Sequence, residues 1–125
     1  MPQFLGLRTV IYHVPDLARA KAWYASATGI EPYFDMPFYV GFEVGGYELG
    51  LDPNPASGSA GTSGPTAYWG VPDAGVAVAY LISVGAAPHQ PVQEVGEGIR
   101  VAAVLDPFGN VLGVIENPHF RIKPA

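Results

Sequence analysis

The hydrophobic pattern changes period along the first half of the chain. It opens with a run of apolar and β-branched residues whose apolar positions fall on both faces, as in a strand covered on both sides. Apolar positions at helical spacing follow, between Asp16 at the N-cap position and Gly29, which can end a helix in the left-handed conformation. Three short apolar segments come next, the last two joined by Gly45-Gly46, a strong hairpin signal. The predicted elements are strands at 4–14, 31–34, 38–44 and 47–52 and one helix between Asp16 and Gly29.

The second half of the chain repeats this order of elements. Asp73 follows a strand-like segment and caps a weaker helical pattern that runs up to Gly85. Segment 106–110 contains Asp, Pro, Gly and Asn, which together predict a tight hairpin turn. The strands predicted in this half are at 66–71, 89–95, 99–105 and 111–116. Each half therefore predicts one β-α-β-β-β module.

Two sequence echoes indicate that one module is used twice. Val14-Pro15-Asp16 recurs as Val71-Pro72-Asp73 at an offset of 57, and Leu49-Gly50-Leu51 matches Leu112-Gly113-Val114 at an offset of 63. A longer loop in the second copy absorbs the difference between the offsets. We therefore predict an α+β fold in a single domain, with module one at about 4–52, a Pro-, Gly-, Ser- and Ala-rich linker at 53–64, module two at about 65–118 and a tail at 119–125.

Composition narrows the class of protein. The chain has 125 residues, of which 49% are hydrophobic and 14% charged, enough apolar material for a buried core. There is no cysteine, so a metal would need His, Asp or Glu as ligands. A net charge of -5 with only six dispersed Lys and Arg argues against a nucleic-acid partner. No signal peptide or membrane-spanning run is recognisable, so we expect a soluble cytoplasmic protein with no membrane partner.

Two motifs carry a resemblance to a known superfamily. They are Val14-Pro15-Asp16-Leu17, followed by Trp23-Tyr24 and Gly29, and Asp106-Pro107-Phe108-Gly109-Asn110, followed by an apolar strand. With the paired modules, they resemble the vicinal oxygen chelate superfamily, which includes glyoxalase I, extradiol dioxygenases and the fosfomycin and bleomycin resistance proteins. The resemblance implies a curved mixed sheet around a cleft, with helices outside and the ligand inside. It also implies a homodimer, with each cleft inside one chain or shared between exchanged modules.

The resemblance further implies four cleft-facing positions that hold a divalent metal in the enzymes of the superfamily. Carried onto this chain, they fall at Thr9, Gly50, Thr66 and Gly113. Glycine supplies no side-chain donor, and neither threonine is one of the His, Glu or Gln ligands of those enzymes. Both modules depart from the pattern in the same way, with threonine on the first strand and glycine on the fourth. We therefore expect no metal and no other cofactor.

Two residues are candidates for acid–base chemistry. His13 shares a strand face with Thr9 and could act as a cleft acid or base, since an unperturbed imidazole in general titrates near neutrality; a strand-end histidine bonded to the backbone is the alternative. Glu48 shares a face with Gly50 and could enter the cleft or face solvent. Glu116, by contrast, has the wrong parity to replace the missing ligand at Gly113 without a register slip.

Other residues are candidates for ligand contact. Arg100 could bind a ligand carboxylate or pair with Glu94 or Glu97 across a hairpin. By parity with Thr66, Tyr68 points to the cleft. Phe38, Tyr39 and Phe42 could line an aromatic wall. The expected ligand-binding positions are Thr9, His13, Phe38, Glu48, Gly50, Thr66, Tyr68, Arg100 and Gly113.

Two functions from different classes follow from these residues. The first is a metal-free protein resembling the bleomycin resistance branch, which sequesters a small aromatic or amphipathic molecule. The alternative is a glyoxalase-like lyase, isomerase or dioxygenase that uses a non-standard metal site or none, with His13 or Glu48 as general base. An interaction module with no ligand is a third possibility, disfavoured by the variety of inward-facing side chains. The expected partners are a small molecule and a second copy of the chain.

Overall fold

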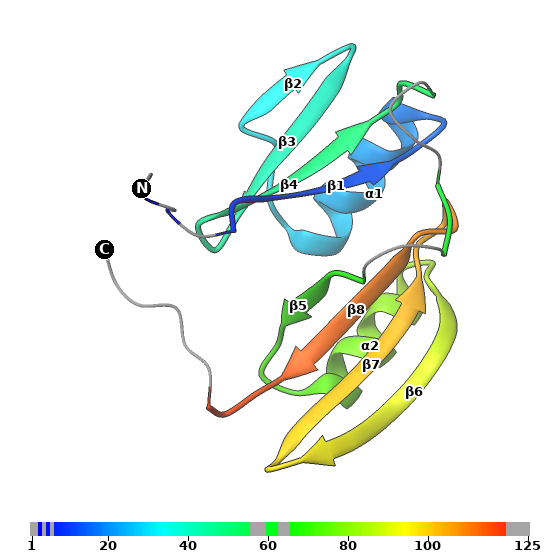
Figure 1. Cartoon of the computed structure of the whole chain (residues 1–125). Helices are drawn as coiled ribbons and strands as arrows, with labels where there is room; N and C mark the ends of the chain where they lie inside the picture. Colours follow the sequence, from blue (N-terminus) through cyan, green and yellow to red (C-terminus); the bar gives the residue numbers. More distant parts are fainter. Residues whose placement is uncertain (1–2, 4, 6, 56–59, 63–65, 120–125) are drawn as a thin grey trace. The chain divides into compact units, whose positions relative to one another are not determined.

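The computed structural model describes residues 3, 5, 7–55, 60–62 and 66–119. It divides the chain into two compact units, Met1–Ala60 and Gly61–Ala125, here called unit one and unit two. Each unit contains one four-stranded mixed sheet and one helix (Figure 1). The predicted α+β class and the repeated β-α-β-β-β order are confirmed. Residues 56–59 and 63–64 of the predicted linker, and the predicted tail beyond 119, lie outside the described residues.

Unit one builds its sheet in the strand order β1-β4-β3-β2. β1 runs parallel to β4, and the remaining neighbours are antiparallel. The crossover from β1 to β4 includes helix α1, which packs on β3 and β4. The elements are β1 (Thr9–His13), α1 (Leu17–Thr28), β2 (Phe34–Met36), β3 (Tyr39–Val44) and β4 (Tyr47–Asp52).

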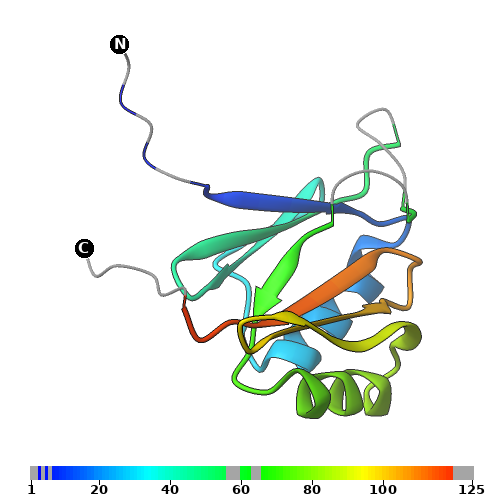
Figure 2. The same cartoon turned by 60° about the horizontal axis from the view of Figure 1, so that its bottom comes forward.

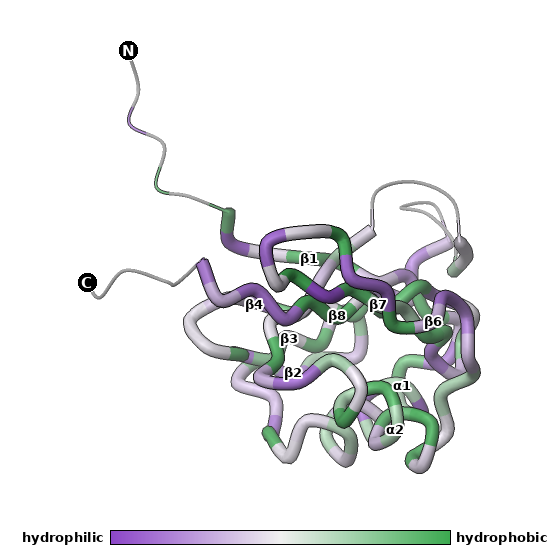
Figure 3. Tube along the Cα trace, turned by 90° about the horizontal axis from the view of Figure 1, so that it is seen from below, coloured by the Kyte–Doolittle hydropathy of each residue, from purple (hydrophilic) through white to green (hydrophobic). Residues whose placement is uncertain are grey.

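Unit two has the same topology, with the strand order β5-β8-β7-β6. β5 runs parallel to β8, and the other neighbours are antiparallel. Helix α2 packs on β6, β7 and β8 and lies along one face of this sheet (Figure 2). Figure 3 shows hydrophobic stretches along β7 and β8. The elements are β5 (Tyr68–Gly70), α2 (Ala74–Ser83), β6 (Ala87–Gly96), β7 (Ile99–Leu105) and β8 (Val111–Glu116).

Both helices begin at an aspartate, as predicted. The Asp16 side chain accepts a hydrogen bond from the backbone N–H of Arg19, and Asp73 does the same for Val76, so each cap satisfies a donor that the helix itself leaves open. Gly29 ends α1 in the left-handed conformation, with φ 72°. Among the described residues, no helix is long and apolar enough to cross a membrane.

The strand register confirms the repeat at the level of individual residues. On β1 and β4, Ile11 lies opposite Gly50, and on β5 and β8, Tyr68 lies opposite Gly113. The offset of 57 carries Ile11 onto Tyr68, and the offset of 63 carries Gly50 onto Gly113. The two echoes found in the sequence therefore mark the same parallel strand pair in both units.

The core of unit one lies between its sheet and α1. The rings of Tyr12 on β1 and Tyr24 on α1 are 5.9 Å apart between centroids. Strand alternation sends the remaining side chains to the other face, which includes Thr9 and Glu48, joined by a hydrogen bond. We call this helix-free side of the sheet the open face of unit one. The buried side chains of the core include Tyr12, Tyr24, Val40, Phe42, Leu49 and Leu51.

Several strand ends differ from the prediction, most of all those of β1 and β2. β1 begins at Thr9 rather than near residue 4, because β4, its neighbour among the described strands, begins at Tyr47 and the register already places Thr9 opposite Glu48. β2 covers 34–36 instead of 31–34. Pro32 lies in the predicted segment and has no N–H to donate to a neighbouring strand, whereas Met36 pairs with Tyr39.

The turn at 106–110 has the predicted hairpin geometry. Asp106 Oδ1 accepts hydrogen bonds from the backbone N–H groups of Phe108 and Asn110, both at 2.9 Å. Gly109 has φ 88°, a conformation that favours glycine. Asp106 and Asn110 are only 3% and 6% exposed, so the turn holds two buried polar side chains against each other. Asn110 Oδ1 also accepts from the N–H of Gly61, at 3.1 Å, which ties the start of unit two to this turn.

Candidate functional site

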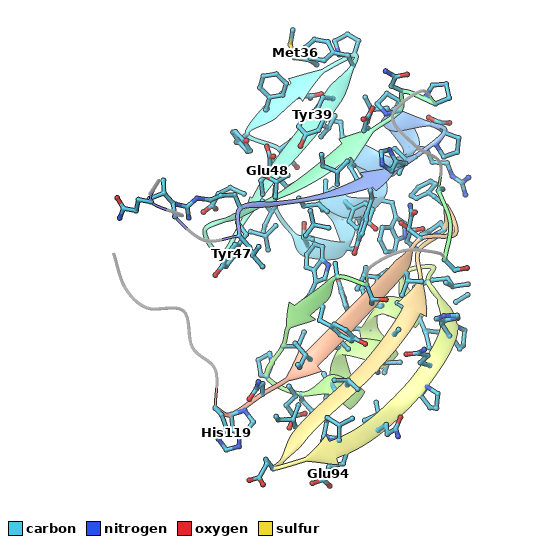
Figure 4. All side chains as sticks on the ribbon, in the orientation of Figure 1. Met36, Tyr39, Tyr47, Glu48, Glu94 and His119 are labelled. Atoms are coloured by element: carbon cyan, nitrogen blue, oxygen red, sulfur yellow. The ribbon has the colours of Figure 1, made fainter. Side chains whose placement is uncertain are left out.

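The open face of unit one carries a carboxylate surrounded by hydroxyl groups. Glu48 Oε1 accepts hydrogen bonds from Thr9 Oγ1 at 3.0 Å and from Tyr39 Oη at 2.9 Å. Its other oxygen, Oε2, accepts from the hydroxyl of Tyr33. These four residues come from β1, β3, β4 and the segment just before β2, and we call them the Glu48 cluster; Tyr39 and Glu48 are labelled in Figure 4.

Two glycines make room for this cluster. A Cβ atom on Gly50 would lie 1.9 Å from Tyr39 Oη, so a side chain there would displace the tyrosine hydroxyl. A Cβ atom on Gly41 would lie 2.7 Å from Glu48 Oε2. The tyrosine ring therefore lies over the strand position that a side chain would otherwise occupy, and from there it reaches the carboxylate.

The cluster keeps its carboxylate ionised and its phenols neutral. The hydrogen bond from Tyr33 lowers the pKa of Glu48; partial burial opposes that change, and the bonds from Tyr39 and Thr9 add to it. The hydrogen bond to Glu48 raises the pKa of Tyr33. Burial, followed by the same carboxylate, raises the pKa of Tyr39 well above its ordinary value. At neutral pH the cluster therefore carries one negative charge.

Replacing Glu48 with glutamine is expected to weaken the fall in stability at acid pH. The folded-state pKa of Glu48 is lowered, so its contribution is present above its unfolded pKa of about 4.3 and is lost as the pH falls through the folded value. The difference in unfolding free energy between wild type and Glu48→Gln should shrink between about pH 6 and pH 3. Urea titrations at several pH values measure it.

Glu94→Gln, at an exposed carboxylate on β6, is the control for this comparison. Because Glu94 is exposed to solvent on β6, the difference between wild type and this variant should stay nearly constant over the same pH range. A difference for Glu48→Gln that is equally constant would show that the hydroxyl groups do not favour the ionised carboxylate.

Beside the cluster, a shallow groove of about 460 Å³ opens on unit one. Its lining includes Glu48, Glu43 and Arg8, together with Tyr33 and Tyr47. Glu43 lies directly opposite Glu48 in the β3–β4 register, and its Oε1 accepts from the N–H of Gly46 at 2.9 Å. Tyr33 is 63% exposed, so its ring is accessible to a ligand. Tyr47 precedes Glu48 on β4, so strand alternation directs its side chain to the opposite face. The groove therefore combines aromatic surface with two carboxylates and one guanidinium.

The corresponding position in unit two is also covered by a tyrosine. A Cβ atom on Gly113 would lie 2.7 Å from Cδ1 of Tyr68 and 2.8 Å from the backbone oxygen of Ala67. Tyr68 is the direct neighbour of Gly113 in the β5–β8 register. In both units, then, a tyrosine ring fills the space in front of the glycine that marks the repeat.

Arg100 does not lie with Gly113 and Tyr68. Its Nη1 forms an ion pair with Glu116 Oε1 at 3.3 Å, and the same oxygen accepts from the N–H of Ala74 at the start of α2, at 2.9 Å. The alternative of a pairing with Glu94 or Glu97 is therefore wrong. Strand alternation puts Arg100 and Glu116 on the helix side of the sheet, opposite the face of Gly113.

The remaining candidates lie apart from the Glu48 cluster. His13 ends β1 on the face of Thr9, opposite Asp52 in the register. Phe38 is 63% exposed in the turn between β2 and β3, where its ring contacts Phe34 at a centroid distance of 6.2 Å. Phe42 is fully buried on the α1 side, so it cannot line a wall on the open face as expected. Thr66 precedes β5.

Comparison with known proteins identifies the family. Residues 6–114 match the model of the Glyoxalase/Bleomycin resistance protein/Dioxygenase superfamily. The chain belongs to this superfamily, which confirms the resemblance seen in its motifs. No match is found among curated proteins.

Solved structures with the same fold share little sequence with this chain. A glyoxalase-related enzyme from Fulvimarina pelagi is 16% identical, with a TM-score of 0.77 over 96% of this chain and 94% of that one. A superfamily member from Sphaerobacter thermophilus is 19% identical, with a TM-score of 0.75 over 91% and 98%. Lactoylglutathione lyase from Agrobacterium tumefaciens is 16% identical, with a TM-score of 0.74 over 97% and 100%. At these identities the likeness shows the fold alone.

The residues at the expected metal positions do not fit a metal ion. Gly50 and Gly113 have no donor atoms, and tyrosine rings fill the space in which a longer side chain would begin. The hydroxyl of Thr9 is bonded to Glu48. Within the described residues, no three His, Asp or Glu side chains come close enough together to share a metal. The donor set therefore departs from the chelating members of the superfamily.

Proposed function

We propose that this protein binds a small aromatic or amphipathic molecule without a metal, and acts by sequestering it, in the manner of bleomycin resistance proteins. The groove beside the Glu48 cluster is the proposed site. The observation that carries the proposal is the replacement of chelating side chains by tyrosines packed over glycines. Such a site offers aromatic surface and fixed polar groups, the usual lining of small-molecule pockets.

The chemistry of Glu48 supports binding over proton abstraction. A general base works best when its pKa lies near the operating pH, and the hydrogen bonds to Glu48 move its pKa downward, away from neutrality. These bonds come from the three hydroxyl groups of Thr9, Tyr33 and Tyr39, which stabilise the ionised carboxylate and so make it a weaker base. His13, the other candidate base, belongs neither to this cluster nor to the lining of the groove.

A titration with small aromatic compounds tests the proposal. Burying about 100 Å² of apolar ligand surface contributes about 2.5 kcal/mol, from which the cost of ordering the ligand is subtracted. We expect saturable binding of at least one compound, detected by ligand-observed NMR and unchanged when a chelator is present. Tyr33→Ala should weaken this binding, because it removes the exposed ring from the groove.

Tyr80→Ala, at a 46% exposed ring on α2, is the matched control and should leave binding unchanged. Loss of binding in the presence of the chelator would favour the metal-dependent alternative. Equal effects of the two tyrosine variants would place the ligand elsewhere.

A further inference from the structure

We propose that the groove of unit one selects ligands that carry a positively charged, hydrogen-bond-donating group next to an aromatic body. This inference rests on the function proposed above and names the ligand class of the same site. Ammonium, amidinium and guanidinium groups are the chemical forms that fit. Three features of the groove carry it: its free hydrogen-bonding capacity, its charge and its aromatic surface.

The first feature is that the Glu48 cluster offers acceptors only. An ionised carboxylate has no proton to donate, so Thr9, Tyr33 and Tyr39 must each donate to it. A hydroxyl has a single proton, so each of the three has used its one donor and keeps only lone pairs. A carboxylate has about four acceptor sites, and Oε2 of Glu48 holds one bond where Oε1 holds two. A ligand group that only donates therefore matches the cluster.

The second feature is the charge of the groove. Glu43 and Glu48 lie directly opposite each other on β3 and β4, an arrangement of like charges that destabilises a sheet. Arg8 also lines the groove, so the two carboxylates and one guanidinium leave one net negative charge. A ligand cation near the two carboxylates would reduce their repulsion, whereas a ligand anion would increase it.

The third feature is the position of the Tyr33 ring. Tyr33 lines the same groove as the two carboxylates, and it is 63% exposed. The face of a tyrosine ring attracts a cation that lies within about 6 Å of its centroid. The same ring also covers the apolar body of a ligand. A cationic head and an aromatic body are thus recognised by adjacent parts of one groove.

The inferred preference for cationic ligands is the reverse of the preference that a metal site would have. A bound divalent ion attracts the lone pairs of ligand oxygens, because it is a positive charge. In this chain, the carboxylate of Glu48 stands on the same strand and face as Gly50, two residues before that metal position. The local charge at this part of the site is therefore negative.

Matched probes test the inference on the whole chain. Benzylamine and benzamidine are cations at pH 7, benzyl alcohol and benzamide are neutral compounds of similar size, and benzoate is an anion. We expect each cation to bind about tenfold more tightly than its neutral partner, and benzoate more weakly than either, in titrations followed by NMR. Raising the salt concentration should reduce this preference, because the groove is open to solvent.

Variants that remove one carboxylate test whether the preference for cations arises in the groove. Glu48→Gln should abolish it, whereas Glu94→Gln, which removes the same charge from β6 of unit two, should leave it unchanged. Glu43→Gln is a second groove variant that keeps all the hydrogen bonds of the Glu48 cluster, so it tests the charge even where Glu48→Gln perturbs the fold. We expect Glu43→Gln to reduce the preference several-fold.

The outcomes separate this inference from the proposed function. Equal binding of cations and their neutral partners, or a preference that survives both groove variants, would overturn the inference and leave small-molecule binding standing. Absence of binding by every probe would overturn the proposed function together with the inference.

Discussion

Replacing Asp106 with alanine is expected to lower the free energy of unfolding by about 3 kcal/mol. The side chain is 3% exposed and accepts from two backbone N–H groups of its own turn, those of Phe108 and Asn110. Alanine would leave both donors without this acceptor in a mostly buried turn, and each such donor costs about 1 to 3 kcal/mol. Urea unfolding followed by circular dichroism measures the loss.

Asp106→Asn separates the hydrogen bonds from the size of the side chain. Asparagine keeps an oxygen that can accept from the same two N–H groups, so we expect a loss of only about 1 kcal/mol. That residual loss comes from placing a second amide group against Asn110, whose own side-chain oxygen is bonded to Gly61. If the alanine variant proves as stable as the asparagine variant, the side-chain oxygen does not hold this turn.

The fold is predictable from the sequence because local chemistry sets most of it. Asp16 and Asp73 cap the helices through their own side chains, and Gly29 ends α1 in a conformation that other residues avoid. The repeat is visible because both copies keep Val-Pro-Asp before the helix and a Leu-Gly pair on the last strand, whose glycine lies in the same parallel strand pair. Strand ends are less predictable, since they depend on where the partner strand begins.

Part of the candidate site can also be predicted from the register of the β3–β4 hairpin. A two-residue turn at Gly45-Gly46 pairs Val44 with Tyr47, which places Glu43 opposite Glu48. Parity with Gly50 had already put Glu48 on the open face. Tyr33 is different, because it falls in the predicted strand at 31–34 but lies just before β2 in the structure, and only the path of the chain brings its hydroxyl to Glu48.

Register reasoning would also have found the partner of Arg100. The turn at 106–110 pairs Leu105 with Val111, and counting outward along both strands brings Arg100 opposite Glu116. In the preceding hairpin, Glu94 is the register neighbour of Arg100 on β6. The ion pair forms with Glu116 instead, and Glu116 also binds the N–H of Ala74 at the start of α2.

Gly113→Ala is expected to lower the free energy of unfolding by about 2 kcal/mol, the usual cost of overpacking. The new Cβ atom would lie 2.8 Å from the backbone oxygen of Ala67 and 2.7 Å from the ring of Tyr68. The ring could rotate, but that oxygen accepts the hydrogen bond from the N–H of Gly113 itself and cannot move away without breaking the β5–β8 pairing. Thermal or urea unfolding measures the effect.

Gly70→Ala is the control for the backbone entropy of glycine, because Gly70 lies on β5 of the same unit with nothing within 4 Å of its Cβ position. It should change stability by less than about 1 kcal/mol. Gly50→Ala differs from both, since its contact is the movable hydroxyl of Tyr39. We expect a smaller loss of stability there, together with loss of the bond from Tyr39 to Glu48. Equal stabilities of the Gly113 and Gly70 variants would mean that the packing over Gly113 adapts freely, and a glycine would then not be required beneath Tyr68.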